Sequence, residues 1–469
     1  MSTNSVTHTS GSTASGAPGG SGDPGGPGAS HRPSPTLTLT AALLGFALIT
    51  LDASVVNVAL PAIGDALGGG MSGLQWVVDA YTLAFAALML STGAFSDRVG
   101  ATHAYAIGVA VFTLASAACG LAPSLPVLIA SRVVQGVAAA VMLPASLALV
   151  RQAYADPAKR ARAVAAWAAG GSAAVALGPV AGGALTTAWD WRGIFFVNLP
   201  LGAVALALLV RAPRSGRRPA PLDLPGQLAA VVALTALTFA VIEGGTTGLV
   251  ALIVAVAATV AFLRIEARQP HPVVPLGLFR DRTVAVTVAA GAACSVAFFG
   301  MVFVFSLFFQ QVQGRSALNA GLMFLPMTGL IAVTNIVAGR LAGRFGPRVP
   351  MLVGQVLAVA GLLLVLGVDA HTPGPVLAFM LVPLALGCAL TVPPLTAAMM
   401  DAVPAERAGL AAGVLNAARQ VAGGLGIAAF GTLVSDGFLA GMRISLLISA
   451  GLLVATAVAT LRLRRGTAS

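Results

Sequence analysis

Uncharged stretches of about twenty residues recur along this 469-residue chain from Leu37 onwards. An α-helix of that length crosses the roughly 30 Å hydrocarbon core of a bilayer. A soluble chain of this size needs a charged surface, whereas only 9% of these residues are charged and 57% are hydrophobic. The sequence therefore predicts an all-α membrane protein that crosses the bilayer many times.

Charged and Pro/Gly-rich breaks divide the chain into fourteen predicted membrane helices. They cover residues 37–63, 74–95, 103–122, 125–150, 161–186, 193–210, 226–243, 248–264, 283–309, 317–339, 350–368, 374–400, 408–434 and 443–461. Residues 1–36 are rich in Gly, Ser, Thr and Pro and lack the apolar core of a cleaved signal. We expect them to form a disordered cytoplasmic tail.

The positions of the basic residues test this count, because short cytoplasmic loops collect Lys and Arg. With the amino terminus inside, Arg192, Arg315 and Arg443 fall outside, and Arg132 and Arg419 fall within helices. The rest of the 26 Lys and Arg fall inside. A missed helix would invert this bias downstream, so the charges favour fourteen crossings with both termini in the cytoplasm. The bias also accounts for the net charge of +11 without nucleic-acid binding.

Two motifs of the first half recur in the second. GAFSDRVG at 93–100 has a weaker echo in GRLAGRFG at 339–346, and PAKRARAVAAW at 157–167 resembles PAERAGLAAGV at 404–414. Internal repeats of this kind are typical of alternating-access transporters, whose binding site lies between two bundles near the bilayer midplane.

The repeats predict a division of the chain into domains. We expect six-helix bundles at 37–210 and 283–461, a linker with two inserted membrane helices at 211–282, and a short cytoplasmic tail at 462–469.

Two acidic residues lie inside predicted helices, Asp52 in LDASVVNVALP and Asp79 in QWVVDAYTLAF. A carboxylate near the bilayer centre costs about 2.5 to 3.5 kcal/mol on insertion scales, so each should face a polar cavity or a partner. Either acid can bind a proton or a cationic substrate, and the sequence does not divide these roles. The alternatives are a packing role for Asp52 and simple solvation at the outer helix end for Asp79.

Polar residues in other predicted helices can assist these acids. Arg132 stands in ASRVVQG with Gln135 close behind. A guanidinium stays protonated, so it can bias a neighbouring acid or hold one conformation, and either intramembrane acid is a candidate partner. A purely structural ion pair is the alternative. Asn57 can add a hydrogen bond within the bundle or merely pack, and we expect Arg419 to be mainly structural.

Glycine-rich motifs mark two further candidate sites. In GPVAGG, Gly178, Gly182 and Gly183 allow neighbouring helices to approach closely, and Pro179 interrupts the backbone hydrogen bonds and bends its helix. The residues that can form a cytoplasmic gate after the second helix are Gly93, Asp97, Arg98 and Gly100. A charge cluster at a helix end can lock such a gate in one state and release it in another.

No motif for an enzyme is present in the sequence. It has no GxxxxGK[ST] loop for ATP, no HExxH motif and no serine or cysteine nucleophile with a plausible histidine partner. The three cysteines lie in apolar runs without metal-ligand spacing. We therefore expect neither an enzyme nor a metal or cofactor, and the energy for transport should come from an ion gradient.

Six motifs carry a family resemblance from Leu37 to Arg464. They are LDASVVNVALP, GAFSDRVGATH, LIASRVVQGVAAAVMLPA, GSAAVALGPVAGGAL, WDWRGIFFVNLPLG and LNAARQVAGGLG. In this order they resemble the fourteen-helix drug:proton antiporters of the major facilitator superfamily, in particular antibiotic exporters of the methylenomycin A resistance type.

The resemblance implies a fold and roles for several residues. It implies the major facilitator fold, a coupling or substrate-contacting acid at Asp52, a part for Arg132 in proton coupling, and export from the GPVAGG motif. Ala101, Thr102 and His103 replace the basic residues that the family usually has after the last glycine of the gating motif. We therefore expect that gate interaction to be weaker or differently placed.

These inferences predict a proton-driven exporter of a small, partly apolar drug or antibiotic in the inner membrane of a bacterium. We expect it to act as a monomer without a cofactor and to bind no nucleic acid. Two alternatives remain open at this stage. One is an exporter of an endogenous metabolite or siderophore, and the other is a membrane receptor or channel without coupled transport.

Overall fold

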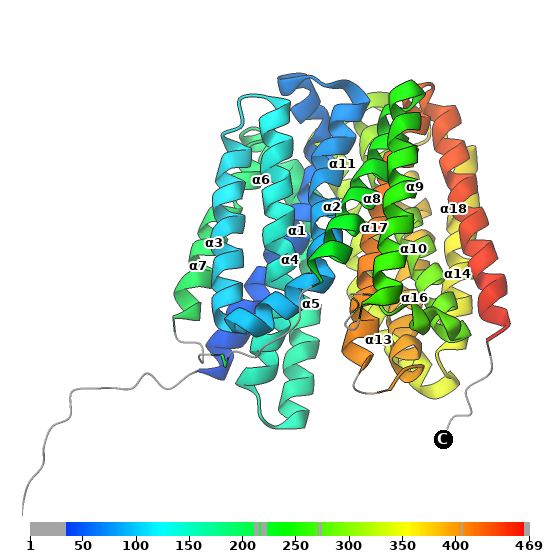
Figure 1. Ribbon diagram of the computed structural model, residues 1–469. Helices are drawn as coiled ribbons and strands as arrows, with labels where there is room; N and C mark the ends of the chain where they lie inside the picture. Colours follow the sequence, from blue (N-terminus) through cyan, green and yellow to red (C-terminus); the bar gives the residue numbers. More distant parts are fainter. Residues whose placement is uncertain are drawn as a thin grey trace, which may run out of the picture. The chain divides into compact units, whose positions relative to one another are not determined.

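The computed structural model describes residues 34–210, 215–216, 223–269, 272, 274–404 and 407–463. Every regular element in this described part is a helix (Figure 1). The predicted tail at 1–36 lies outside it up to residue 33, and residues 35 and 36 already belong to the first helix. The predicted tail at 462–469 lies outside it from residue 464 onwards.

The helices fall into three groups along the chain. The N-terminal helices are α1 (Pro35–Leu67), α2 (Gly70–Val99), α3 (Ala101–Gly120), α4 (Leu125–Ala153), α5 (Pro157–Ala188), α6 (Gly193–Phe196) and α7 (Asn198–Leu209). The middle group is α8 (Leu224–Glu243), α9 (Gly245–Arg268) and the short η1 (Leu276–Arg280). The C-terminal helices are α10 (Arg282–Leu307), η2 (Phe308–Val312), α11 (Ala317–Met323), α12 (Leu325–Gly329), α13 (Ile331–Phe345), α14 (Arg348–Leu364), η3 (Val365–Gly367), α15 (Gly374–Met380), α16 (Val382–Asp401), α17 (Ala408–Ser435) and α18 (Phe438–Leu461).

All fourteen segments predicted as membrane helices are helical. In the described part, twelve helices are long and apolar enough to cross a membrane, and α2 is a thirteenth if its two halves, which meet at a bend of 65°, form one span. The segment predicted at 193–210 is the short pair α6 and α7, an apolar stretch of 17 residues. The all-helical membrane fold is thus confirmed, while the count of fourteen crossings stays a prediction.

Two helix boundaries differ from the predicted ones and change the position of charged residues. α2 begins at Gly70 instead of residue 74, after a turn in which Gly68 and Gly69 have positive φ. Asp79 therefore lies about two and a half turns inside the helix. α18 begins at Phe438, so Arg443 lies within a helix and not in a loop.

The helix ends explain part of the internal repeat. Gly100 follows α2 with φ +92°, and Gly346 follows α13 with φ +76°. Only glycine adopts such angles without strain, so both echoes of the GAFSDRVG motif end a helix in the same way. The division into domains at 37–210, 211–282 and 283–461 remains a prediction.

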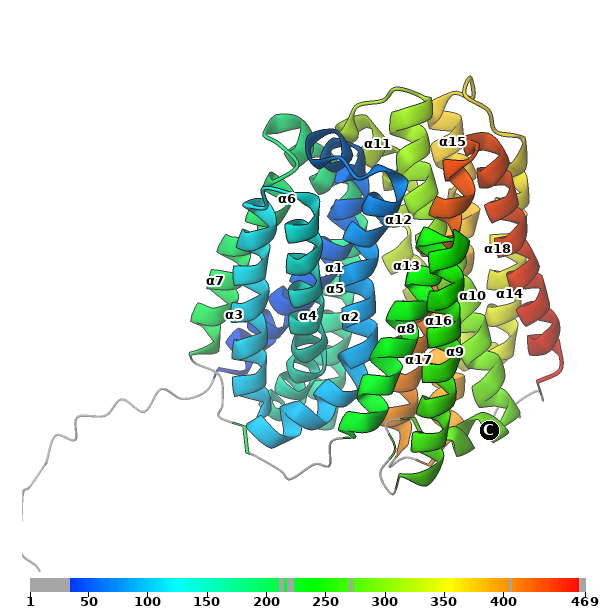
Figure 2. The same ribbon diagram turned by 45° about the horizontal axis from the view of Figure 1, so that its top comes forward.

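Helices within each group pack mainly on one another. α1 contacts α4, α5 and α7, while α10 contacts α16, α17 and α18. α8 packs against α9 and also against α2 and α17, so it joins the two large groups. Figures 1 and 2 show α3, α4 and α7 on one side, α14 and α18 on the other, and α8 and α9 between them.

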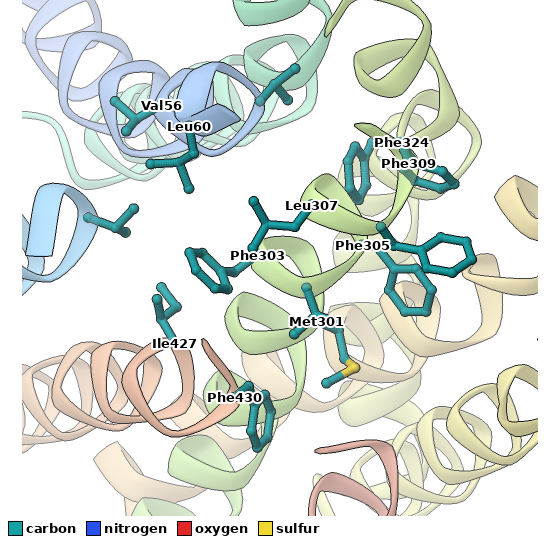
Figure 3. Close-up of a cluster of buried hydrophobic side chains, with 14 of the residues drawn as sticks. Val56, Leu60, Met301, Phe303, Phe305, Leu307, Phe309, Phe324, Ile427 and Phe430 are labelled. Carbon is teal, nitrogen blue, oxygen red and sulfur yellow. The ribbon is translucent and has the colours of Figure 1, made fainter. Parts of the chain in front are cut away.

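An apolar cluster joins the N-terminal and C-terminal helices near the end of the molecule where α1, α5 and α10 end. We call this the sealed end. Val56 and Leu60 of α1 face Phe303 and Leu307 of α10, with Ile427 of α17 alongside (Figure 3). These side chains are buried, so the cluster removes a large apolar area from solvent and holds the two groups together at this end.

Hydrogen bonds strengthen the same contact. The Ser306 hydroxyl donates to the carbonyl oxygen of Asn57 at 2.7 Å, and Gln310 Nε2 donates to that of Val58 at 3.0 Å. The backbone NH of Leu318 donates to Thr187 Oγ1 at 3.2 Å. The sealed end is thus closed by both apolar and polar contacts between the two groups.

Candidate functional site

Asp52 and Arg132 form an ion pair inside the N-terminal helices. Arg132 Nη1 donates to Asp52 Oδ2, and both side chains are fully buried. Arg132 Nη1 also donates to Gln135 Oε1 at 2.9 Å, and Arg132 Nε donates to the carbonyl oxygen of Val77 at 3.1 Å. Of the two candidate partners that the sequence offered for Arg132, the structure places Asp52 beside it.

Two buried amides complete the shell around Asp52. Its Oδ1 accepts from Gln135 Nε2 at 3.2 Å and from Asn198 Nδ2 at 2.9 Å. The same two amides donate to Ser116 Oγ at 3.1 and 2.9 Å. The network therefore links α1, α3, α4 and α7. The sequence analysis missed Asn198 and Ser116, although Asn198 is a polar residue in the apolar run FFVNLPLG.

Tyr81 separates this network from the interior space of the molecule. The Arg132 guanidinium lies 4.3 Å from the centre of the Tyr81 ring, a distance at which a cation is attracted to the ring face. The Tyr81 hydroxyl donates to the carbonyl oxygen of Ile49 at 3.1 Å. The outer face of Tyr81 then lines a cavity between the two groups of helices.

The cavity has a volume of about 360 Å³, and its walls come from α1, α2, α4, α5, α10, α12 and α17. α1 turns one face to it through Ile49, Ala53 and Asn57, while Asp52 points from another face into the buried network. Asn57 Nδ2 donates to the carbonyl oxygen of Ala53 at 3.2 Å. Of the polar residues singled out from the sequence in α1, Asn57 thus lines the cavity and Asp52 does not.

The cavity walls are mainly apolar and aromatic. Phe46 of α1 and Trp167 of α5 stack with ring centres 4.2 Å apart. The charged residue among the lining side chains is Arg419 of α17. It forms no ion pair with any acid in the described part of the chain, so a structural ion pair does not account for it.

Asp79 lies at the contact between α2 and α17. It is fully buried, and neither carboxylate oxygen accepts a hydrogen bond from a described residue. Gly424 provides the space opposite, since a Cβ there would lie 3.3 Å from Asp79 Oδ1. Gln75, one turn earlier on α2, donates to the carbonyl oxygen of Ala428 at 2.5 Å. The alternative of a solvated acid at the helix end is therefore excluded.

The glycines of GPVAGG lie where α5 meets its neighbours. A Cβ on Gly182 would lie 3.0 Å from the Cα of Val55, and one on Gly178 would lie 2.6 Å from the Cβ of Ser54. Gly183 faces α11, where an added Cβ would be 2.8 Å from the Cα of Leu318. Contacts this short exclude side chains, so the motif brings α5 against both α1 and α11 at the sealed end.

A bulky side chain at Gly183 should open this contact. Overpacking costs about 1 to 3 kcal/mol, enough to lower the population of the sealed state roughly tenfold. We expect Gly183→Leu to speed the reaction of a cysteine placed at Asn57 with a membrane-impermeant maleimide applied from the sealed end. Gly451→Leu is the matched control, because Gly451 has open space around it. Equal labelling rates in the two variants would contradict this role.

The predicted gating residues lie at the other end of α2. Asp97 and Arg98 belong to its last turn and are exposed, and Gly93 has open space beside its Cα. A Cβ on Gly100 would lie 3.0 Å from the carbonyl oxygen of Ser215, and Ser215 Oγ accepts from the backbone NH of Thr102 at 3.2 Å. The segment after α2 thus contacts the linker, and its function as a gate stays a prediction.

Comparison with known proteins gives the family. Residues 42–427 match the model of the Major Facilitator Superfamily. The chain is 40% identical over 410 residues to the multidrug resistance protein Stp of Mycobacterium tuberculosis, which covers 85% of this chain and 76% of that protein. It is 38% identical over 403 residues to the methylenomycin A resistance protein of Streptomyces coelicolor. This match covers 84% of this chain and 85% of that protein.

Solved structures show the same fold at low sequence identity. A D-xylose-proton symporter matches with a TM-score of 0.69 at 15% identity, over 92% of this chain and 99% of that one. A bacterial homologue of the human lysosomal transporter Spinster, in an inward-facing and unoccupied conformation, matches with a TM-score of 0.67 at 18% identity. The match covers 92% of this chain and 97% of that one. The chain therefore belongs to the major facilitator superfamily, and it is a membrane transporter and not an enzyme.

Proposed function

We propose that this protein exports a small drug or antibiotic from the bacterial cytoplasm in exchange for protons, by alternating access. The relatives at 38% and 40% identity are named for methylenomycin A resistance and multidrug resistance, which supports such a substrate. The observation that carries the proposal is the central apolar cavity, closed at the sealed end, with the unpaired acid Asp79 at the helix contact beside it.

Asp79 is the proton carrier in this proposal. An ionised carboxylate without a partner is costly in a buried site, and a proton bound to it removes most of that cost. Asp52, by contrast, already accepts hydrogen bonds from Arg132, Gln135 and Asn198. Asp52 thus has a charged partner, whereas Asp79 has none among the described residues, and we therefore assign different roles to the two acids.

The position of Asp79 couples its proton to the movement of helices. Val78 and Thr82, its neighbours on α2, line the cavity, and Asp79 itself meets α17 of the other helix group. A neutral Asp79 permits the close α2–α17 contact of the sealed state. Loss of the proton favours separation of these helices, because the carboxylate then gains water.

The Asp52–Arg132 network serves a different purpose. Its hydrogen bonds connect α1, α3, α4 and α7. Arg132 also packs on the ring of Tyr81, a residue that lines the cavity. We propose that this network keeps the N-terminal helices rigid while the two groups move against each other around the cavity.

In the predicted topology the sealed end faces outwards and both termini lie in the cytoplasm. The sealed state then opens to the cytoplasm, where the drug enters and Asp79 releases its proton. The opposite state takes up a proton from outside and releases the drug. The Gly178–Gly183 motif and the gating residues Gly93, Asp97, Arg98 and Gly100 would close the outer and inner ends in turn.

The test combines resistance with purified transport. The chain is expressed in a host that lacks its own pumps, and an antibiotic panel identifies a substrate by raised resistance. Purified protein in proteoliposomes should then accumulate that substrate when a pH gradient is applied with the potential clamped. One pH unit corresponds to about 1.4 kcal/mol, so exchange for one proton gives about tenfold accumulation. Equal accumulation of the substrate without the gradient refutes proton coupling. Export of endogenous metabolites, with no antibiotic exported, refutes a drug as the substrate.

A further inference from the structure

Arg419 is a half-buried cation, and the proposed mechanism gives it no role. It stands in the middle of α17, and its Nε has no hydrogen-bond partner in the described part of the chain. The thiols of Cys294 on α10 and Cys388 on α16 lie near it, and a thiol is ordinarily a much weaker acid than a carboxyl group. A guanidinium cannot shed its proton at neutral pH, so this positive charge persists inside the bundle.

The side chain of Arg419 lines the cavity. Gly291 of α10 lies against its aliphatic stem, since a Cβ there would be 3.1 Å from Arg419 Cγ and 3.2 Å from Cδ. The missing side chain at Gly291 lets the stem lie along α10. The cavity wall on α17 then presents Arg419 between Asn416 and Gln420, both of which also line the cavity.

Among the described residues, the remaining walls supply no opposite charge. Apolar and aromatic side chains dominate them, including Phe46, Trp167 and Phe299. Asp52 is held behind Tyr81 by Arg132, and Asp79 is buried between α2 and α17. Neither acid is among the residues that line the cavity, so neither neutralises Arg419 there.

We propose that the substrate carries an anionic group, such as a carboxylate, a sulfonate or an acidic enol, on an apolar and partly aromatic body. Arg419 binds this anion, Asn416 and Gln420 add hydrogen bonds, and the stacked pair Phe46 and Trp167 receives the body. Because Nε of the guanidinium is shielded and the side chain has no acidic partner in the described part of the chain, an anion gains a charge-assisted bond there that the chain itself does not provide. The inference deepens the proposed function by assigning the substrate class.

A matched pair of fluorescent probes tests this assignment. 8-Anilinonaphthalene-1-sulfonate is an anion, and N-phenyl-1-naphthylamine is the corresponding uncharged molecule. We measure the binding of each probe to the purified full-length protein in nanodiscs without any gradient. We expect Arg419→Gln to weaken binding of the sulfonate by at least about tenfold and to leave binding of the neutral amine unchanged, as loss of a charged hydrogen bond predicts. Arg419→Lys should retain part of the affinity for the sulfonate.

Arg443→Gln is the control, because Arg443 is an exposed arginine in α18 and its loss removes the same charge from the protein. An unchanged affinity for the sulfonate in Arg419→Gln overturns the proposal. An equal loss for both probes also overturns it, since Arg419 then only supports the fold.

A second measurement needs no variant. On the wild-type protein, naphthalene-1-sulfonate should displace the bound sulfonate probe at lower concentration than naphthalene-1-sulfonamide, and equal displacement contradicts an anion site. These assays measure binding alone. A chain that binds anions but shows no gradient-driven transport would refute the proposed function and leave this inference standing.

Discussion

Asp79→Asn should abolish accumulation driven by a pH gradient while leaving the exchange of substrate across the membrane intact. Asparagine has the shape of a protonated aspartate but cannot release a proton, so the α2–α17 contact persists without titration. In proteoliposomes with the potential clamped and a gradient of one pH unit, we expect accumulation to fall from about tenfold to none. Exchange of labelled for unlabelled substrate should continue at a similar rate.

Asp65→Asn is the matched control, because Asp65 is an exposed acid near the end of α1. It should accumulate substrate like the wild type. Thermal unfolding supplies a further check, since Asp79→Asn removes an unpartnered buried carboxyl and should not lower stability. Full accumulation by Asp79→Asn would exclude Asp79 as the proton carrier.

Asp52→Asn should strongly destabilise the protein, because it leaves the Arg132 guanidinium buried without its acid. Breaking a buried ion pair from one side costs about 3 to 5 kcal/mol. We expect the double variant Asp52→Asn/Arg132→Met, which removes both charges, to recover most of this loss. Thermal unfolding of the purified variants measures both effects, and the double-mutant cycle gives the coupling energy of the pair.

The exposed pair Asp190 and Arg192 provides the control, with nitrogen and oxygen 2.9 Å apart. Asp190→Asn should change stability by at most about 1 kcal/mol, as is usual for solvated pairs. Transport by the double variant then separates two roles for Asp52. If Asp79 carries the proton, the double variant still responds to the pH gradient, at a reduced rate. A stable double variant that has lost all response would move the proton site to Asp52.

The two acids illustrate how far local sequence can lead. Both were recognisable as functional candidates because a charge in an apolar helix needs a reason. Their surroundings were not recognisable. Asp52 is saturated by residues from α4 and α7 that lie 80 and 146 positions away, whereas Asp79 meets a glycine on α17. The contrast that separates their proposed roles exists only after the helices pack.

The surroundings of Arg419 were likewise not predictable from the local sequence. The sequence places Arg419 in the family motif LNAARQVAGGLG, but this motif alone indicated only a structural role, because an arginine in an apolar run looks alike whether it pairs or faces a cavity. Its neighbours Gly291, Cys294 and Cys388 come from α10 and α16. Only their arrangement leaves the guanidinium at the cavity wall without an acidic partner in the described part of the chain.

The sequence by itself determined the fold class, the approximate limits of the helices and the family. Runs of apolar residues must be helical in lipid, since no other single segment satisfies its own backbone hydrogen bonds there, so a local pattern suffices. The tertiary structure alone decided which polar groups meet, where the cavity lies and which charge remains unpaired. Lipid does not drive helices together by hydrophobicity, and their pairing depends on close contacts between distant residues, such as Gly183 against Leu318.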